Sequence, residues 1–113
     1  MYEEQLSGLE ELLLPPPPDS DPDHFDVYQN YELAAKDRDN LRAFLSDKGV
    51  KTIIQWSGVP VHHFEQLGFG RSKFSDLKST DDFFDKCMML PINMSLSDTD
   101  VNHIIDSVNK FYV

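Results

Sequence analysis

Residues 27–56, VYQNYELAAKDRDNLRAFLSDKGVKTIIQW, contain the pattern that decides the fold. Their first part, residues 27–34, is rich in aromatic and β-branched side chains and predicts a strand. Residues 37–47 predict an amphipathic helix that begins at an aspartate and that Gly49 is placed to end in the left-handed conformation. The short apolar run at residues 50–56 predicts a second strand. Together the three segments form one α/β unit.

The second half of the chain predicts two further helices. Residues 79–88 start with polar N-cap residues and continue with apolar ones, and Pro91 follows closely. Residues 97–111 start with a second cap signal, and their apolar residues recur at helical spacing. Between 61 and 78, glycines and histidines interrupt the aromatic residues, which is typical of a structured loop.

These segments predict an α+β (α/β) fold. A small, largely antiparallel sheet would contain residues 27–34 and 50–56, and the three predicted helices would cover one of its faces. The chain has 113 residues, of which 40% are hydrophobic. This is the length and composition of one small domain.

The N-terminal segment predicts a helix that ends before a proline tract. Leucines recur at helical spacing within residues 2–13, and four prolines follow at 15–18. We expect residues 1–18 to be a helix remnant and Pro-rich linker, and residues 19–113 to be the domain. The leucines should then be poorly buried, and removing residues 1–18 should change the free energy of unfolding little. The prolines also permit a Pro-rich adaptor segment that binds SH3-type domains.

The charge distribution excludes nucleic-acid binding. Residues 1–35 hold nine acidic residues and no Lys or Arg, whereas residues 36–113 hold eleven acidic and ten basic residues. A protein that binds nucleic acid needs a basic face to neutralise phosphates. The acidic first third is instead typical of a solvated surface.

The sequence predicts a soluble, cytoplasmic protein without a membrane span. No apolar run approaches the roughly 20 residues that a transmembrane helix needs. The first eleven residues are acidic, whereas a signal peptide starts with basic residues. Cys87 is the one cysteine, so no internal disulfide can form, and it lies on the apolar face of a predicted helix, which is typical of a buried, inert thiol.

Two short segments offer candidate binding residues. His62 and His63 are adjacent, and on an extended backbone they would point in different directions, so joint binding of one metal ion is awkward. Three roles stay open: one packed and one solvated histidine, a hydrogen bond to a substrate, or a metal ligand. Gln55 and Trp56 offer an amide and a flat apolar face, which suit binding or core packing. Nucleophile elbows and phosphate-binding glycine loops are absent from the sequence.

The order of several short motifs resembles one enzyme family. The motifs are YQNYE at 28–32, RDxLxxxL at 38–45, GVxT at 49–52, QWSGxxVH at 55–62, MLP at 89–91 and SD at 97–98. In this order they resemble the C-terminal domain of the DegT/DnrJ/EryC1/StrS family of sugar aminotransferases. The resemblance covers nearly the whole chain and implies the small C-terminal domain of the aspartate aminotransferase type fold, a short sheet covered by about three helices.

The resemblance also implies a function. Family members use pyridoxal phosphate (PLP) to transfer an amino group from glutamate to a keto sugar attached to a nucleotide, and their Schiff-base lysine lies in a larger N-terminal domain. We expect this chain to bind no PLP alone, to be inactive alone, and to partner that domain or a subunit carrying it. His62, Gln55 and Trp56 are the expected substrate-binding residues, with no catalytic, cofactor or metal residues assigned. A stand-alone sugar-nucleotide-binding or protein-interaction module is the alternative.

Overall fold

A short antiparallel sheet connects the parts of the molecule. The structure is a computed structural model that describes residues 1–70 and 76–113. Within these residues the strands are β1 (Leu12–Leu13), β2 (Tyr31–Ala35) and β3 (Cys87–Leu90), in the order β1-β2-β3. The α-helices are α1 (Tyr2–Leu6), α2 (Arg38–Asp47), α3 (Lys78–Lys86) and α4 (Asp98–Tyr112), and the 3-10 helices are η1 (Gln55–Gly58), η2 (Val61–His63) and η3 (Glu65–Leu67). The predicted α+β fold with a largely antiparallel sheet is confirmed.

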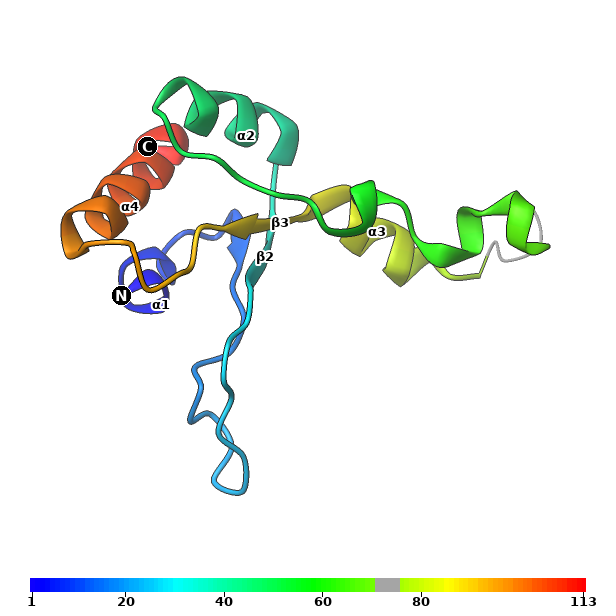
Figure 1. The fold of residues 1–113 in the computed structure, drawn as a ribbon, viewed down its shortest axis with the longest axis horizontal. Coiled ribbons are helices and arrows are strands. Elements are labelled where there is room, and N and C mark those ends of the chain that lie inside the picture. Colours follow the sequence, from blue (N-terminus) through cyan, green and yellow to red (C-terminus); the bar gives the residue numbers. More distant parts are fainter. Residues whose placement is uncertain (71–75) are drawn as a thin grey trace.

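The hydrophobic core lies between one face of the sheet and three helices. Tyr31 pairs with Leu90 and Leu33 pairs with Met88 across β2 and β3, and these four side chains are buried in one cluster. Helices α1 and α2 both pack on α4. Figure 1 shows α1, α2 and α4 gathered on one side of the strands. The core therefore combines residues from both ends of the chain.

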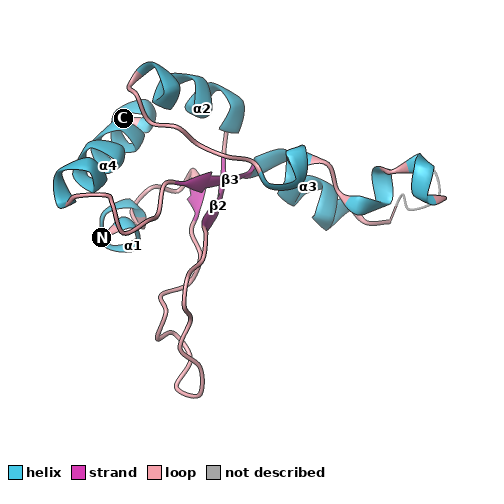
Figure 2. Cartoon of the chain, in the orientation of Figure 1, coloured by secondary structure: helices cyan, strands magenta, loops and turns pink. Residues whose placement is uncertain are grey.

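Two extensions leave this core in different directions. The loop between β1 and β2 runs down from the sheet in Figure 1, and residues 55–70 and 76–86, which include η1 and α3, extend to the right. Figure 2 shows that the first extension is loop and the second contains short helices. The shape is accordingly open, with principal extents of 47 × 40 × 28 Å. No helix among the described residues is long and apolar enough to cross a membrane.

Two predicted helices are confirmed with their terminal signals. Helix α2 has Asp37 at its N-cap position and is followed by Gly49, whose φ of +79° is the expected left-handed conformation. Asp37 itself makes no capping hydrogen bond and instead accepts one from the Asn40 side chain. Helix α4 begins with a full capping box: the Asp100 amide donates to Ser97 Oγ at 3.2 Å, and the Ser97 amide donates to Asp100 Oδ2 at 2.9 Å.

The predicted first strand is shifted along the chain. The structure has β2 at Tyr31–Ala35 in place of residues 27–34, and Val27 is 84% exposed. The strand begins at Tyr31 because a strand needs a neighbour to pair with. Within this segment β3 pairs with Tyr31–Ala34, and the residues before Tyr31 extend beyond the end of the sheet, where none of the strands in the described residues lies beside them.

The predicted strand at residues 50–56 is wrong. In this segment Ile53 forms a single isolated bridge with Met89, and η1 begins two residues later. Trp56 and Ser57 adopt left-handed φ values of 52° and 56°, which end the extended conformation. A short apolar run does not distinguish a strand from a segment that touches a sheet once. The strand–helix–strand unit is therefore incomplete.

The predicted helix at residues 79–88 merges a helix with a strand. Helix α3 ends at Lys86, and Cys87–Leu90 form β3, in which all four residues are buried. Met88 and Leu90 belong to the core cluster, and Met89, which the alternation of a strand places on the other face, is contacted by the Gln55 side chain, so both faces of β3 are covered. The predicted N-cap is also displaced, because α3 begins at Lys78 after Leu77 and has no side-chain cap. Cys87 is buried as expected, but in a strand.

The N-terminal segment is part of the core, contrary to the sequence-based expectation. Leu6 is completely buried, and the Tyr2 hydroxyl donates a hydrogen bond of 2.8 Å to the Pro91 carbonyl. Burial raises the pKa of Tyr2 to about 12. The helix ends at Leu6, and Leu12 and Leu13 instead pair with Ala35 and Ala34 as strand β1. Leu6 thus belongs to helix α1, whereas Leu12 and Leu13 belong to strand β1.

Truncating Leu6 should destabilise the protein far more than truncating Leu13. Leu6 is 0% exposed and Leu13 is 72% exposed. We expect Leu6→Ala to lower the free energy of unfolding by about 2–5 kcal/mol, because it leaves a cavity between α1 and α4. Leu13→Ala should change it by less than about 0.5 kcal/mol. Urea denaturation followed by circular dichroism measures both, and equal midpoints for the two variants would contradict the docked position of α1.

The capping box of α4 should contribute measurably to stability. Ser97→Ala removes the oxygen that accepts from the Asp100 amide. The expected loss is about 0.5–2 kcal/mol of unfolding free energy. Ser95→Ala, two residues earlier in an exposed turn, is the matched control and should have almost no effect. A thermal denaturation series in which both serine variants behave alike would refute this role.

Candidate functional site

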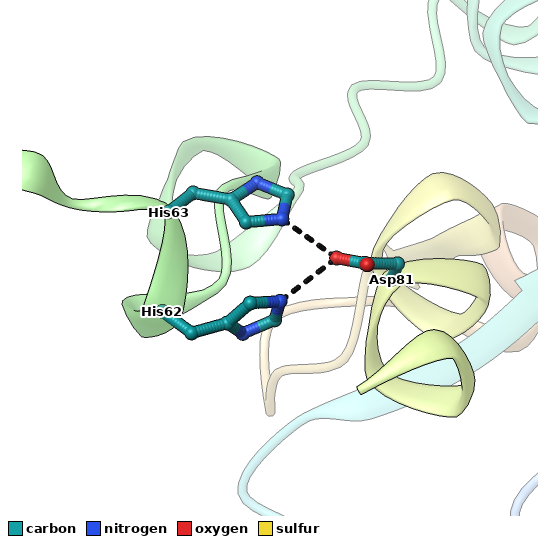
Figure 3. A group of neighbouring side chains, drawn as sticks. All are labelled: His62, His63 and Asp81. Atoms are coloured by element: carbon teal, nitrogen blue, oxygen red, sulfur yellow. Dashed lines mark hydrogen bonds and ion pairs between the residues drawn. The ribbon is translucent and has the colours of Figure 1, made fainter. Parts of the chain in front are cut away.

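Two histidines and one aspartate converge between η2 and α3. His62 Nε2 lies 2.9 Å and His63 Nε2 lies 2.7 Å from the same carboxylate oxygen, Asp81 Oδ1. Figure 3 shows both imidazole rings pointing at this oxygen from one side. The side chain of His62 is 5% exposed, that of His63 18% and that of Asp81 24%. The cluster is therefore sheltered but open to solvent at one edge.

The local backbone explains why adjacent histidines can share one partner. Pro60 is extended, and the next three residues turn tightly as the 3-10 helix η2. In this turn the rings of His62 and His63 contact each other edge to face, with centroids 4.4 Å apart. The expectation that adjacent histidines point in different directions is wrong, because it assumed an extended backbone. One of the two is buried and the other half-buried, yet both bind Asp81.

The two histidines lower the pKa of Asp81. Partial burial acts to raise its pKa, but the hydrogen bonds from His62 and His63, together with their charges, outweigh it. The net result is that the pKa of Asp81 lies below its ordinary value. The carboxylate is thus held in its charged form, which accepts a hydrogen bond from each imidazole.

Gln55 and Trp56 lie in η1 and have different surroundings from the histidines. The Gln55 amide nitrogen lies 3.5 Å from the Met89 sulfur, so this side chain turns back toward β3. Trp56 is 76% exposed and has the left-handed backbone conformation. The structure therefore brings His62 together with His63 and Asp81, whereas Trp56 presents its ring to solvent and is not part of the core.

A hollow of about 470 Å³ lies elsewhere on the molecule, between β3 and the start of α4. Its lining includes Lys51, Met89, Asn93 and His103 but none of the three predicted binding residues. It therefore gives no support to a shared site with His62. The glycine-containing segment at 68–73 extends into residues 71–75, which lie outside the described part of the chain.

Sequence reasoning missed two members of the cluster. Asp81 lies among the polar residues that were expected to cap the helix at 79–88, and His63 was not among the expected substrate-binding residues. Asp81 lies 19 residues from His62. Their proximity depends on α3 folding back along η2, which no local pattern encodes. The only signal in the sequence was the pair of adjacent histidines itself.

Removing one histidine should raise the pKa of Asp81. Its lowered pKa stabilises the folded state at pH values above about 3.9, the unfolded value, and this contribution is lost as the pH falls through the folded pKa. We expect Asp81 to titrate below about 3.9 in the parent chain and closer to that value in His63→Ala, measured by carboxyl NMR. An unchanged Asp81 titration in His63→Ala would contradict the pairing.

The comparisons with known proteins agree on one family. Residues 1–109 match the model of the DegT/DnrJ/EryC1/StrS aminotransferase family. The aminotransferase TlmJ from Streptoalloteichus hindustanus is 28% identical, with a TM-score of 0.80 over 96% of this chain and 28% of its own. DesV from S. venezuelae, solved in complex with a ketimine intermediate, is 28% identical, with a TM-score of 0.84 over 98% of this chain and 29% of its own.

A curated protein and a further solved structure are also similar to this chain. A protein named "Pleiotropic regulatory protein" from Geobacillus stearothermophilus is 25% identical over 91 residues, which are 78% of this chain and 23% of that protein. A sugar aminotransferase from Streptococcus pneumoniae, solved in its PMP form and only 16% identical, shares the fold with a TM-score of 0.67. This chain spans between a quarter and a third of the solved chains, and corresponds to their C-terminal portion. It belongs to the DegT/DnrJ/EryC1/StrS aminotransferase family of PLP-dependent enzymes.

Proposed function

We propose that this chain is the substrate-side domain of a nucleotide-sugar aminotransferase and is inactive alone. The observation that carries the proposal is the family match over residues 1–109 together with the fold shared with DesV at 28% identity. The activity would be amino transfer from glutamate to a keto sugar attached to a nucleotide. In this proposal residues 19–113 form most of the domain, and residues 1–18 pack on it and connect it to an N-terminal domain or to a subunit that carries one.

The lysines in the part of the chain that the structure describes do not fit a Schiff-base site. A lysine that binds PLP covalently has to be desolvated and held beneath the cofactor ring. In the described residues all six lysines are exposed to solvent: Lys36, Lys48, Lys51, Lys78, Lys86 and Lys110. The proposal therefore assigns the cofactor to the N-terminal domain and no catalytic residue to this chain.

The substrate contacts are assigned to the segment that contains η1 and η2. Trp56 offers an exposed flat ring against which a sugar or base can stack. Gln55 adds an amide that can donate and accept hydrogen bonds. His62 is 4% exposed, so it supports the same segment from its buried side. These three roles together describe a lid over a substrate held by the partner domain.

Exposed apolar side chains along this extension support contact with a larger partner. Large exposed apolar patches on soluble proteins mark sites of contact with other proteins or ligands. The exposed residues of this segment are Ile53, Trp56, Val61, Phe64, Leu67, Phe69, Leu77 and Phe83. Burying this surface against the rest of an aminotransferase would offset the cost of leaving it in water.

A second candidate function is a stand-alone sugar-nucleotide-binding or protein-interaction module. The exposed indole of Trp56 favours it, because a flat apolar ring can bind a ligand without any cofactor domain. The two candidates differ in one measurable property. The first requires a cofactor-bearing partner, and the second binds its ligand as an isolated chain.

Co-purification of the tagged chain from its native host separates these candidates. We expect a second polypeptide that carries PLP, recognised by intact mass and visible absorbance, and we expect the pair to transaminate a nucleotide-linked keto sugar. Val61→Asp places a charge on an apolar residue that is 63% exposed and should abolish co-purification. Val113→Asp, at a fully exposed residue, is the matched control and should not.

Two results would decide against the proposal. Transamination by the purified chain with added PLP would show that it is active alone. A chain that purifies without any cofactor-bearing polypeptide, and whose single tryptophan Trp56 changes its fluorescence saturably on titration with UDP-glucose, would identify the stand-alone module. In that case His62→Ala should weaken the titration and His103→Ala should leave it unchanged.

A further inference from the structure

We propose that His62, His63 and Asp81 form a binding site for a divalent first-row transition-metal ion. Their three ligand atoms, two imidazole nitrogens and one carboxylate oxygen, all lie within 4.8 Å of one another. The three residues come from two separate elements, η2 and α3, which converge at this point (Figure 3). The inference concerns this cluster alone and does not depend on the proposed aminotransferase function.

The spacing of the ligand atoms suits one ion. Zn²⁺ binds imidazole nitrogen and carboxylate oxygen at about 2.0–2.2 Å, so two ligand atoms of a tetrahedral site lie roughly 3.3 Å apart. Here the nitrogens of His62 and His63 lie 2.9 and 2.7 Å from Asp81 Oδ1. Lengthening these two distances by about half an ångström would give the spacing of a tetrahedral site. The ion would replace the two hydrogen bonds that now hold the cluster.

The donor set selects the class of ion. Two neutral imidazoles and one carboxylate carry a single negative charge, which a divalent cation more than balances. Imidazole nitrogen favours Zn²⁺, Co²⁺, Ni²⁺ and Cu²⁺, whereas Mg²⁺ and Ca²⁺ favour sites made of oxygen ligands. Three protein ligands with one open position are typical of zinc sites that also hold a water molecule or a further ligand. The partial exposure of His63 and Asp81 places that position at the solvent edge.

The cluster is organised before an ion binds. The 3-10 turn of η2 fixes both histidine backbones, and the edge-to-face contact of the rings restricts their rotation. Asp81 lies on α3, whose last turn is held by Arg38 Nη1 donating to the Phe84 carbonyl. A bound ion would therefore link η2 to α3 and stabilise the extension that carries Trp56. This is a structural consequence that does not require catalysis.

Zinc titration of the full 113-residue chain tests the proposal. After removal of metal with a chelator, we expect saturable binding of one Zn²⁺ per chain by calorimetry and a higher unfolding temperature. With Co²⁺ as the probe, we expect intense visible absorption bands of a four-coordinate ion with nitrogen ligands. His63→Ala and Asp81→Asn should each weaken Zn²⁺ binding by at least about tenfold, because loss of a ligand costs no less than loss of a residue that orients one.

The two histidines outside the cluster provide matched controls. His24 is exposed and lies 3.3 Å from Asp21, and His103 Nε2 lies 2.9 Å from the Lys48 carbonyl. His24→Ala and His103→Ala should leave the affinity unchanged. Binding that His24→Ala abolishes, or that survives in both His63→Ala and Asp81→Asn, would mean an adventitious ion only and overturn the proposal. Absence of saturable binding in the parent chain would also overturn it. Circular dichroism establishes that each variant is folded, and Asp81→Asn suffices if His63→Ala does not fold.

Discussion

The antiparallel pairing of β2 with β3 is the interaction on which the rest of the structure depends. It joins Tyr31–Ala34 to Cys87–Leu90, two segments far apart in the sequence. On one face, Leu33, Met88 and Leu90 meet the helices of the core. On the free edge of β3, Met89 exchanges backbone hydrogen bonds with Ile53 and so fixes where the chain departs toward η1. Without this pairing neither the core nor the extension would have a defined position.

The same strand determines where the candidate site lies. Helix α3 runs directly into β3, so the position of β3 also fixes the direction of α3 and of Asp81. Arg38, at the start of α2, donates to the Phe84 and Cys87 carbonyls and thereby satisfies groups that the end of α3 leaves without helical partners. The histidines approach from the other side, because the left-handed residues of η1 turn the chain back before Pro60. The position of the cluster is therefore determined by the sheet and by the turns η1 and η2.

The chain matches its relatives over nearly all of its own length but covers less than a third of theirs. The properties of this chain therefore have to be distinguished from those of the longer family members. The core, the sheet and the cluster belong to this chain, whereas all six lysines in the described residues are exposed, unlike the desolvated lysine that a Schiff base needs. In our proposal the apolar residues exposed along the extension contact a partner domain. An ion held by the histidines and Asp81 would stiffen that extension without taking part in the cofactor chemistry.

The sequence by itself determined the elements whose signals are local. Helices α2 and α4 lie where amphipathic spacing, Gly49 and the Ser97 cap predicted them, and the ordered motifs indicated the family, because these signals act within a few residues. Only the tertiary structure decided the rest. Residues 87–90 form a strand and residues 50–56 do not, because strand formation depends on a partner edge supplied by distant residues. Leu6 is buried because α4 covers it, and Asp81 meets His62 and His63 because α3 folds back along η2. Contacts between remote segments are not encoded in either segment alone.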